Sequence, residues 1–411
     1  MFEHKNSYPV ILVPGIVGYG EETSVGRVLP YFGLTATSAQ KVITSMGLEC
    51  HTPTFGLLSG AWDRACELYA QIVGGTVDYG EAHSKKHGHA RYGKTYKSPM
   101  VPNWGRLDGE GNVVKINLIA HGFGVTVARL FIELMNNGSA EEKAVTPENS
   151  LSGLFRGGFN NIIHSLVSLA GINDGITLFQ ALEDRIPGVQ RGLVKAAIIA
   201  EELSARSGFV DTYYLKHGLA VTQYQFECKL IDANDSDEKK KFTDRVVFSE
   251  EKISDYLSQG EGNIFYDVGL HGMSDFNNSL GTHENTYYIF EMGSVTQSIM
   301  DKVTIPKLSA GILAPTAALI STYENYLPEK PIATPQIFDN DGLVNAESSM
   351  PPINEPVAAF KSANRCKPGI WYQLSIRDKN HLWFRGFGQR PDRYRNYIYD
   401  IVKEICNLDT I

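Results

Sequence analysis

The sequence predicts an α/β fold with a mostly parallel central sheet flanked by helices. Apolar runs of strand length alternate along the chain with segments of helical periodicity, and this order builds a parallel sheet. The chain has 411 residues, of which 43% are hydrophobic and 20% charged, which is enough apolar material for a large packed core. Because α/β folds with insertions reach this length as one unit, we expect a single domain over residues 1–411.

The expected elements follow this alternation in order. Strands are expected at residues 10–13, 114–119, 162–169, 287–290 and 370–376. A helix is expected over residues 125–135, because Asn-Asn-Gly follows it as a stop signal. The last helix is predicted by an apolar stripe at helical spacing that consists of Tyr394, Ile398, Ile401, Val402 and Ile405.

Two stretches are longer than sheet connections require. Residues 56–105 are rich in His and Gly, and we expect them to form an insertion. Residues from about 176 to 225 carry more apolar side chains than one sheet-facing helix uses. A helical lid over an apolar pocket has this pattern, and so does an ordinary helical layer.

Charge and cysteine content exclude several classes of protein. The formal net charge of -8 is spread along the chain, and the one dense basic run, residues 239–241, lies among acidic residues, so no nucleic-acid binding is expected. No stretch approaches the ~18 apolar residues of a transmembrane helix. The N-terminal residues lack the apolar core of a signal peptide, which favours a cytoplasmic protein; a secreted protein with its leader removed is the alternative. The 5 cysteines are an odd number without CxxC spacing, which predicts free thiols.

Residues 118–125, LIAHGFGV, have the pattern of a nucleophile elbow that lacks its nucleophile. A strand leads through a tight turn into a helix, and such a turn holds the reactive residue at positive φ. Ala120 and Gly124 are small enough for the strand and the helix to approach closely. Gly122 occupies the nucleophile position, where glycine avoids the roughly 1–3 kcal/mol of strain that other residues store. We therefore expect Gly122 to preserve the fold and to remove the attacking oxygen, although a plain strand-to-helix turn would also have this pattern.

The other parts of a serine hydrolase follow at suitable places. Backbone N–H groups of Ile16, in the loop after the first strand, and of Phe123 could form an oxyanion hole. Asp341 precedes a glycine at an expected strand end and could orient the base, and His381 follows the last expected strand and could be that base. Each of these loop residues alone could be an ordinary surface residue. The order nucleophile position, Asp, His is that of α/β-hydrolases, and together these residues predict acyl-ester hydrolysis.

A second cluster points to a metal. Residues 62–94 contain three histidines within seven residues. Asp63, His83 and His89 could converge on one ion, because neutral imidazole and carboxylate suit zinc, and His87 could replace one of them.

This segment closely resembles the thermoalkalophilic, zinc-containing bacterial lipases. Their WDRACE, VGGTVDYG and HGHAR blocks stand here at residues 62–67, 73–80 and 87–91. The resemblance continues through the Pro-Gly loop, the elbow, the Asp-Gly pair at 174–175, NDGLVN at 340–345, GIW at 369–371 and the His-Leu pair at 381. It implies an α/β-hydrolase fold and a lipase or carboxylesterase that acts on acyl esters or lipids by a Ser-Asp-His mechanism.

The resemblance also implies a structural zinc (Zn2+) site. Its ligands would be Asp63, His83, His89 and a fourth carboxylate, for which we choose Asp232 with Asp235 as the second choice. Four protein ligands leave no open coordination position, so this zinc would not be the catalyst. A zinc-dependent hydrolase, which needs an open position, is the alternative.

The chain departs from the family at three places. Gly122 stands where the family has its catalytic serine, and Pro14-Gly15 stands where the family has a His-Gly pair in the oxyanion loop. The Glu and the Asp-Pro pair that help to bind calcium are replaced by Trp383, Gly388 and Gln389, so no calcium is expected there. The first of these departures indicates a carboxylester hydrolase in which Gly122 replaces the nucleophile, and so an inactivated variant. The alternative is a natural pseudoenzyme that binds lipid or a protein partner without hydrolysis.

Overall fold

The computed structural model describes residues 5–21, 23–207, 229–230, 246–247, 250–299, 303–323 and 338–410. At its centre is a seven-stranded sheet with the strand order β12-β13-β9-β6-β5-β1-β2, in which every neighbouring pair is parallel. The strands are β1 (Val10–Val13), β2 (Cys50–His51), β5 (Ile116–His121), β6 (Ile163–Leu169), β9 (Tyr287–Gly293), β12 (Val357–Ala359) and β13 (Trp371–Arg377). The sheet confirms the predicted fold class, and all five expected strands are present. The short edge strands β2 and β12 were not predicted.

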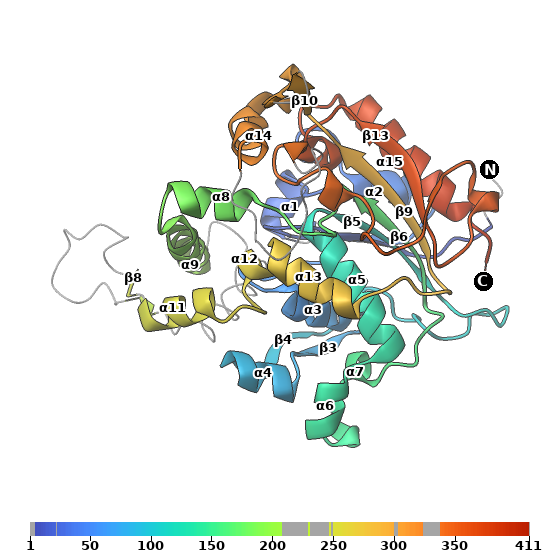
Figure 1. Cartoon of the computed structure of the whole chain (residues 1–411). Helices are drawn as coiled ribbons and strands as arrows, with labels where there is room; N and C mark the ends of the chain where they lie inside the picture. Colours follow the sequence, from blue (N-terminus) through green and yellow to red (C-terminus); the bar gives the residue numbers. More distant parts are fainter. Residues whose placement is uncertain are drawn as a thin grey trace.

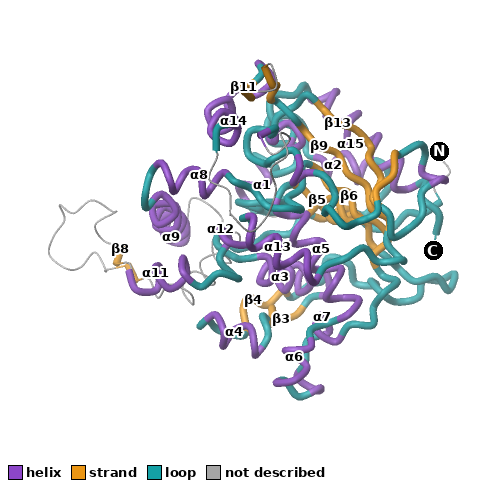
Figure 2. The backbone as a smooth tube through the Cα atoms, in the orientation of Figure 1, coloured by secondary structure: helices purple, strands orange, loops and turns teal. Residues whose placement is uncertain are grey.

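Both faces of the sheet are buried. In β1, Ile11 and Val13 belong to one apolar core, whereas Val10 and Leu12 belong to the other, because successive side chains of a strand point to opposite faces. The helices α3 (Ala61–Val73) and α5 (Phe123–Asn137) pack in the first core, and α2 (Ala39–Ser45) and α15 (Pro391–Cys406) pack in the second. Figures 1 and 2 show these helices on either side of the strands. This layering explains why the strands read as continuous apolar runs.

The remaining elements lie around this core. The segment 56–105 contains α3, the hairpin of β3 (Gly75–Asp78) and β4 (Tyr92–Tyr96), and α4 (Glu81–His87). A helical group, α8 (Leu178–Arg185), α9 (Val189–Ser207) and α11 (Glu250–Ser258), lies at the left of Figure 1, away from the sheet. The other elements are α1 (Ser24–Val28), α6 (Ala140–Val145), α7 (Gly153–Arg156), α12 (Ile264–Asp267), α13 (Leu270–Ser279), α14 (Ala314–Ser321) and the small pairs β7 (Lys229–Leu230) with β8 (Val246–Val247) and β10 (Thr296–Ile299) with β11 (Val303–Pro306).

Two further sequence predictions concern the state of the cysteines and the absence of a transmembrane helix. Cys50, Cys66, Cys366 and Cys406 are free and buried, as predicted; Cys228 lies outside the described residues. Among the described helices, none is both long and apolar enough to cross a bilayer.

The two ends of the chain meet beside β6, and Figure 1 shows them on the same side of the molecule. The side-chain amide of Asn6 donates to the carbonyl oxygen of Ile405 at 2.9 Å, and its nitrogen lies 3.2 Å from Nε2 of His164. His164 is fully buried, and this burial, together with the charge of Lys115, lowers its pKa to about 3. The folded chain therefore holds a buried, neutral imidazole at the place where its two ends pack beside β6.

We predict that His164 makes the fold sensitive to acid. Its pKa falls from an ordinary 6.5 to about 3 on folding. Above pH 6.5 both states hold a neutral imidazole, but between pH 6.5 and pH 3 the unfolded state binds a proton that the folded state does not, so the free energy of unfolding falls with the pH. Each pH unit in that window costs up to about 1.4 kcal/mol of unfolding free energy. In urea unfolding from pH 7 to pH 4, His164→Leu should show a shallower loss of stability than the unchanged chain. The exposed-site control His271→Leu should keep the original slope, and equal slopes for His164→Leu and the unchanged chain would refute the assignment.

Candidate active site and metal cluster

The turn between β5 and α5 has the backbone conformation of a nucleophile elbow. Gly122 stands alone between the last residue of β5 and the first residue of α5, with φ 56° and ψ -125°. Side chains rarely tolerate this conformation, whereas glycine does. Two residues later, a Cβ on Gly124 would lie only 2.5 Å from the carbonyl oxygen of Val13, so glycine lets α5 approach the loop after β1.

Asp341 and His381 form a buried pair beside this turn. His381 Nδ1 lies 2.8 Å from Asp341 Oδ2, and the exposed fractions of the two residues are 8% and 0%. The other carboxylate oxygen of Asp341 accepts the N–H groups of Leu343 and Val344 at 3.0 and 2.8 Å, which fixes the carboxylate in place. The ring of His381 then presents Nε2 to Gly122, where a Cβ would lie 3.0 Å from that nitrogen. The three sequence-predicted positions therefore come together.

Asp341 reaches this site through a turn. Residues 338–345 form no strand; they form a turn closed by an isolated bridge between Asn340 and Asn345, and the residues just before 338 lie outside the described part. The backbone N–H of Val295, just after β9, donates to the carbonyl oxygen of Asn340 at 2.8 Å. A Cβ on Gly293, the last residue of β9, would lie 3.3 Å from the Asp341 Cβ. Asp341 is thus positioned at the carboxyl end of β9 by packing between distant segments.

The predicted oxyanion residues lie on adjacent backbone segments. Phe123 is the first residue of α5, so its N–H has no acceptor within the helix. A Cβ on Gly15 would lie 3.3 Å from the Phe123 nitrogen, which shows that the loop after β1 packs directly against the elbow. Ile16 follows in that loop and is partly buried. The arrangement brings the Ile16 loop and the N-terminus of α5 to the same edge as His381.

Arg64 on α3 holds the oxyanion loop, a role that the sequence did not reveal. This arginine is fully buried. Its guanidinium donates to the carbonyl oxygens of Gly15 at 2.9 Å and Ser59 at 2.8 Å, and it lies 5.1 Å above the ring of Phe123. Arg64 therefore links α3 to both sides of the predicted oxyanion hole. The signal in the sequence is a row of polar residues at helical spacing, Arg64, Glu67 and Gln71, all of which are buried in the structure.

His121, the residue before Gly122, links the oxyanion loop to the His381 loop. Its Nδ1 lies 3.0 Å from the Tyr31 hydroxyl, and its Nε2 lies 3.1 Å from the carbonyl oxygen of His381. The carbonyl oxygen of His381 can only accept, so we assign the ring proton of His121 to Nε2. The Tyr31 hydroxyl, which accepts the N–H of Gly15 at 2.9 Å, then donates its own proton to Nδ1 of His121. Burial and the nearby His381 and Arg385 lower the pKa of His121 well below its usual value, so the bridge is a neutral imidazole.

The predicted metal ligands form a cluster between α3 and the segment that contains α4. One ligand atom each from Asp63, His83 and His89 lies within 4.8 Å of the others. His83 Nε2 is 3.0 Å from Asp63 Oδ1, and His89 Nε2 is 3.8 Å from the same oxygen. His89 Nδ1 is bonded to the Ala90 carbonyl at 3.0 Å, while its buried Nε2 has no hydrogen-bond partner in the described part of the chain. An unpartnered imidazole nitrogen aimed at a buried carboxylate fits a metal ligand.

The histidines of the cluster stabilise the negative charge of Asp63. Burial acts to raise the pKa of Asp63, but His89 and His83 outweigh it and lower that pKa below its ordinary value. Asp232 and Asp235 lie outside the described residues. The ring of His87 lies 4.4 Å from that of His83, and its nitrogens also lack partners among the described residues. His87 therefore remains an alternative ligand.

The expected absence of calcium remains a prediction. Trp383 lies 5.2 Å from the guanidinium of Arg377, which pairs with the buried carboxylate of Glu291 at 2.7 Å. Gln389 donates to the carbonyl oxygen of Trp383 at 2.7 Å. The positions that matched the family's calcium ligands thus carry an aromatic ring and an amide.

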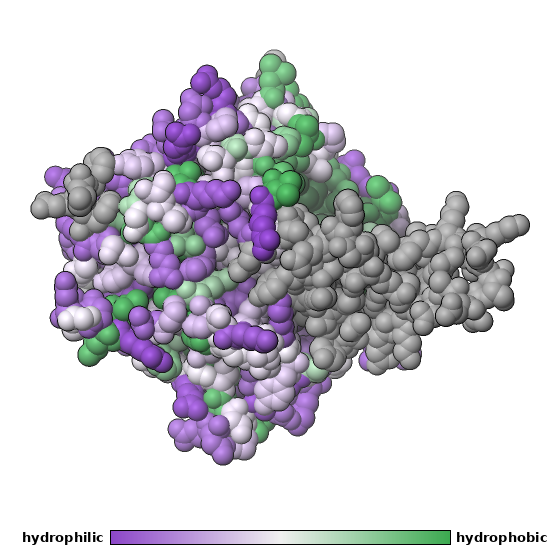
Figure 3. Space-filling view, turned by 180° about the vertical axis from the view of Figure 1, so that it is seen from behind, coloured by the Kyte–Doolittle hydropathy of each residue, from purple (hydrophilic) through white to green (hydrophobic). Residues whose placement is uncertain are grey.

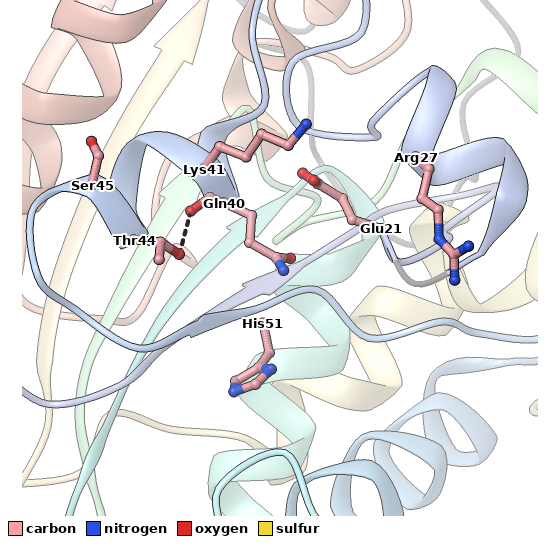
Figure 4. A pocket seen from close by; sticks show the side chains of 7 residues that line it. All are labelled: Glu21, Arg27, Gln40, Lys41, Thr44, Ser45 and His51. Atoms are coloured by element: carbon pink, nitrogen blue, oxygen red, sulfur yellow. Dashed lines mark hydrogen bonds between the residues drawn. The ribbon is translucent and has the colours of Figure 1, made fainter.

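Two cavities differ in their chemistry. The cavity in Figure 4 lies beside α2 and β2, and its lining is polar: Glu21, Arg27, Gln40, Lys41, Thr44, Ser45 and His51. A second cavity of about 460 Å³ is lined in part by Phe179, Leu257, Phe265 and Leu270. Its lining begins at Ile176, shortly after Ile172, whose N–H donates to the carbonyl oxygen of Gly122 at 3.2 Å. The second cavity thus combines a partly apolar lining with a short connection along the chain, from Ile176 back to Ile172 at the elbow.

Known proteins are similar to this chain in sequence and in fold. The model of the family described as lipase-like, C-terminal domain matches residues 6–407. Lipase 2 of Staphylococcus aureus (strain MRSA252) is 27% identical over 413 residues, which cover 98% of this chain and 54% of that protein. The chain thus spans about half the length of the curated relatives it matches.

Two solved structures extend the comparison. The structure of EstA from Clostridium botulinum is 30% identical in sequence and has a TM-score of 0.76, over 100% of this chain and 90% of that one. Lipase 1 from Pelosinus fermentans is 27% identical with a TM-score of 0.72, over 96% and 98% of the two chains.

We predict that Arg64→Met destabilises the fold by roughly 2–4 kcal/mol, because several buried carbonyl oxygens lose their donor at once. Urea unfolding measures this loss. Arg393→Met removes an exposed arginine from α15 and should change stability by no more than about 0.5 kcal/mol. If Arg64→Met matched that control, the carbonyl contacts of Arg64 would not hold the loop.

Proposed function

Because the chain belongs to the lipase-like, C-terminal domain family, we propose that it carries the acyl-ester site of a carboxylester hydrolase in which Gly122 replaces the attacking serine. The family match confirms the predicted lipase family, and the solved relatives confirm the α/β-hydrolase fold. One observation carries the proposal: Nε2 of His381 lies 3.0 Å from the position where a side chain on Gly122 would begin. Asp341 supports the opposite side of the same ring.

With serine at position 122, the site would act by acyl transfer. The serine oxygen would attack the acyl carbonyl, His381 would pass the proton to the leaving alcohol, and Asp341 would hold the imidazole. The N–H groups of Ile16 and Phe123 would stabilise the oxyanion, and water would then release the acid. With Gly122 this covalent route is closed, which in a serine protease costs about 10⁶-fold in rate.

An acyl ester or lipid is the substrate class that the surroundings favour. The second cavity, whose lining begins four residues after Ile172, is partly apolar, as an acyl chain requires. The Asn380 side chain donates to the carbonyl oxygens of Ser309 and Ala310, which joins the His381 loop to a segment where Leu308 and Ile312 are 101% and 64% exposed. Figure 3 shows hydrophobic surface toward the top of the molecule, where Figure 1 places the β10–β11 hairpin just before this segment. Relatives named lipase fit the same substrate class.

The second candidate is a natural pseudoenzyme that binds lipid or a protein partner at this site. Gly122 itself favours it, because the residue that would attack an ester has no side chain. This candidate predicts binding without turnover even after serine is introduced.

We further propose a structural zinc site formed by Asp63, His83 and His89, with Asp232 as the fourth ligand and Asp235 as the second choice. The buried, unpartnered Nε2 of His89 supports it. Bound zinc would cross-link α3 to the segment that contains α4. A catalytic zinc would instead need an open coordination position.

Gly122→Ser should raise kcat/KM for alkyl esters by several orders of magnitude, toward the ~10⁶-fold that a nucleophile supplies. Gly122→Ala is the matched control, because it adds the same Cβ without the oxygen and should show no gain. Both variants should lose about 1–3 kcal/mol of stability, because each places a side chain at φ 56°. A folded Gly122→Ser without gain at any acyl length would favour the pseudoenzyme.

Removal of zinc by a chelator should lower the Tm, and Zn2+ but not Mg2+ should restore it. His89→Ala should lose both the zinc stoichiometry measured by elemental analysis and the response to chelator. His51→Ala, outside the cluster, should retain both. A chelator that abolished the activity of Gly122→Ser without changing the Tm would point to a catalytic metal.

A further inference from the structure

Gly122 leaves space at the nitrogen of His381 that a serine enzyme does not have. A Cβ built on Gly122 would lie 3.0 Å from Nε2 and 3.2 Å from Cε1 of His381, closer than carbon atoms ordinarily approach. No other described atom beyond the chain neighbours of Gly122 lies within 4 Å of that position. A side chain at position 122 would therefore need His381 to move by a few tenths of an ångström.

We propose that His381 acts here as a general base on water, and that the site hydrolyses esters and thioesters with good leaving groups in one step, without an acyl-enzyme. This inference rests on the proposed function, because it uses the same acyl site. It differs in its nucleophile, which is water in place of a side chain.

The geometry suits a water oxygen. A water that donates to an imidazole nitrogen lies about 2.7–3.2 Å from it. Such a water cannot occupy the Cβ position itself, which is at bonding distance from the Gly122 Cα. It would lie farther out on the same side, where His381 is the only described residue within 4 Å of the Cβ position apart from the chain neighbours of Gly122. With Nδ1 of His381 donating to the buried carboxylate of Asp341 at 2.8 Å, Nε2 is the acceptor. The ring is therefore in the tautomer that removes a proton from the side of Gly122.

The reaction balances without a further reactant. Water gives a proton to Nε2 of His381, and its oxygen forms a bond to the acyl carbon. The carbonyl electron pair moves to the oxygen, which the N–H groups of Ile16 and Phe123 would stabilise. When that pair returns, the bond to the leaving group breaks, and the departing phenolate or thiolate takes the proton from His381. The products are a carboxylic acid and a phenol or thiol.

This chemistry selects its substrates by their leaving groups. A phenolate or thiolate departs readily as an anion, whereas an alkoxide is a much poorer leaving group. The site is therefore assigned to aryl esters and thioesters, and alkyl esters such as triglycerides should be turned over far more slowly.

The test measures the hydrolysis of p-nitrophenyl butyrate by the full chain and three variants. The unchanged chain should exceed the buffer rate, with linear release of p-nitrophenol from the first turnover and no acyl adduct by mass spectrometry. His381→Gln should lower kcat/KM by about 10²-fold or more, the usual contribution of a general base. Gly122→Ala should lower it at least tenfold, because its methyl group would stand closer to a water bonded to Nε2 than van der Waals contact allows.

The fourth protein separates this inference from the proposed function. Gly122→Ser should release a burst of p-nitrophenol equal to the enzyme concentration when deacylation is slow, and it should carry an acyl adduct. If Gly122→Ser is active while the unchanged chain does not exceed His381→Gln, the water mechanism is wrong and the proposed function stands. Equal rates for the unchanged chain and Gly122→Ala would likewise overturn the water mechanism, and since a strained Gly122→Ala could unfold, the comparison with His381→Gln decides in that case.

Discussion

The candidate active site depends on one buried hydrogen bond, from Nδ1 of His381 to Oδ2 of Asp341. It spans 2.8 Å and joins two loops 40 residues apart in sequence, each at the carboxyl end of a parallel strand. The carboxylate is fully buried, and the N–H groups of Leu343 and Val344 compensate for its lost hydration. Without this bond the imidazole ring could rotate, and neither an oxygen on residue 122 nor a water would find Nε2 in a fixed direction.

The metal cluster and the active site share one helix. Asp63 and Arg64 are adjacent in α3; the first lies in the metal cluster, and the second donates to the carbonyl oxygen of Gly15. Any force that fixes α3 against the segment containing α4 therefore also fixes the loop of Ile16. The proposed structural ion would in this way help to fix the loop of Ile16 without contact with substrate.

The sequence predicted what depends on local pattern and missed what depends on tertiary contact. The inner strands were predictable, because burial on both sides gives unbroken apolar runs, whereas β2 and β12 are too short to give a signal. Gly122, Asp341 and His381 were found through turn chemistry and chain order. The roles of Arg64 and His121 were not, because only distant loops supply their carbonyl and hydroxyl partners. The fourth metal ligand stays a prediction, since Asp232 lies outside the described residues.

Gly122 relaxes the turn, but it does not explain why the base persists. A glycine at φ 56° avoids roughly 1–3 kcal/mol of strain, so the elbow is stable without a nucleophile. The Asp341–His381 pair does not stabilise the fold in a comparable way, because the cost of desolvating a buried carboxylate offsets most of what its hydrogen bonds contribute. A chain with two hydrophobic residues of similar volume at these positions would fold as well. The pair nevertheless holds the proton of His381 on Nδ1 and directs Nε2 at Gly122. A base held in that tautomer, next to the proposed oxyanion loop, is arranged for proton transfer, and a water on the open side of Gly122 is the proton donor that we propose.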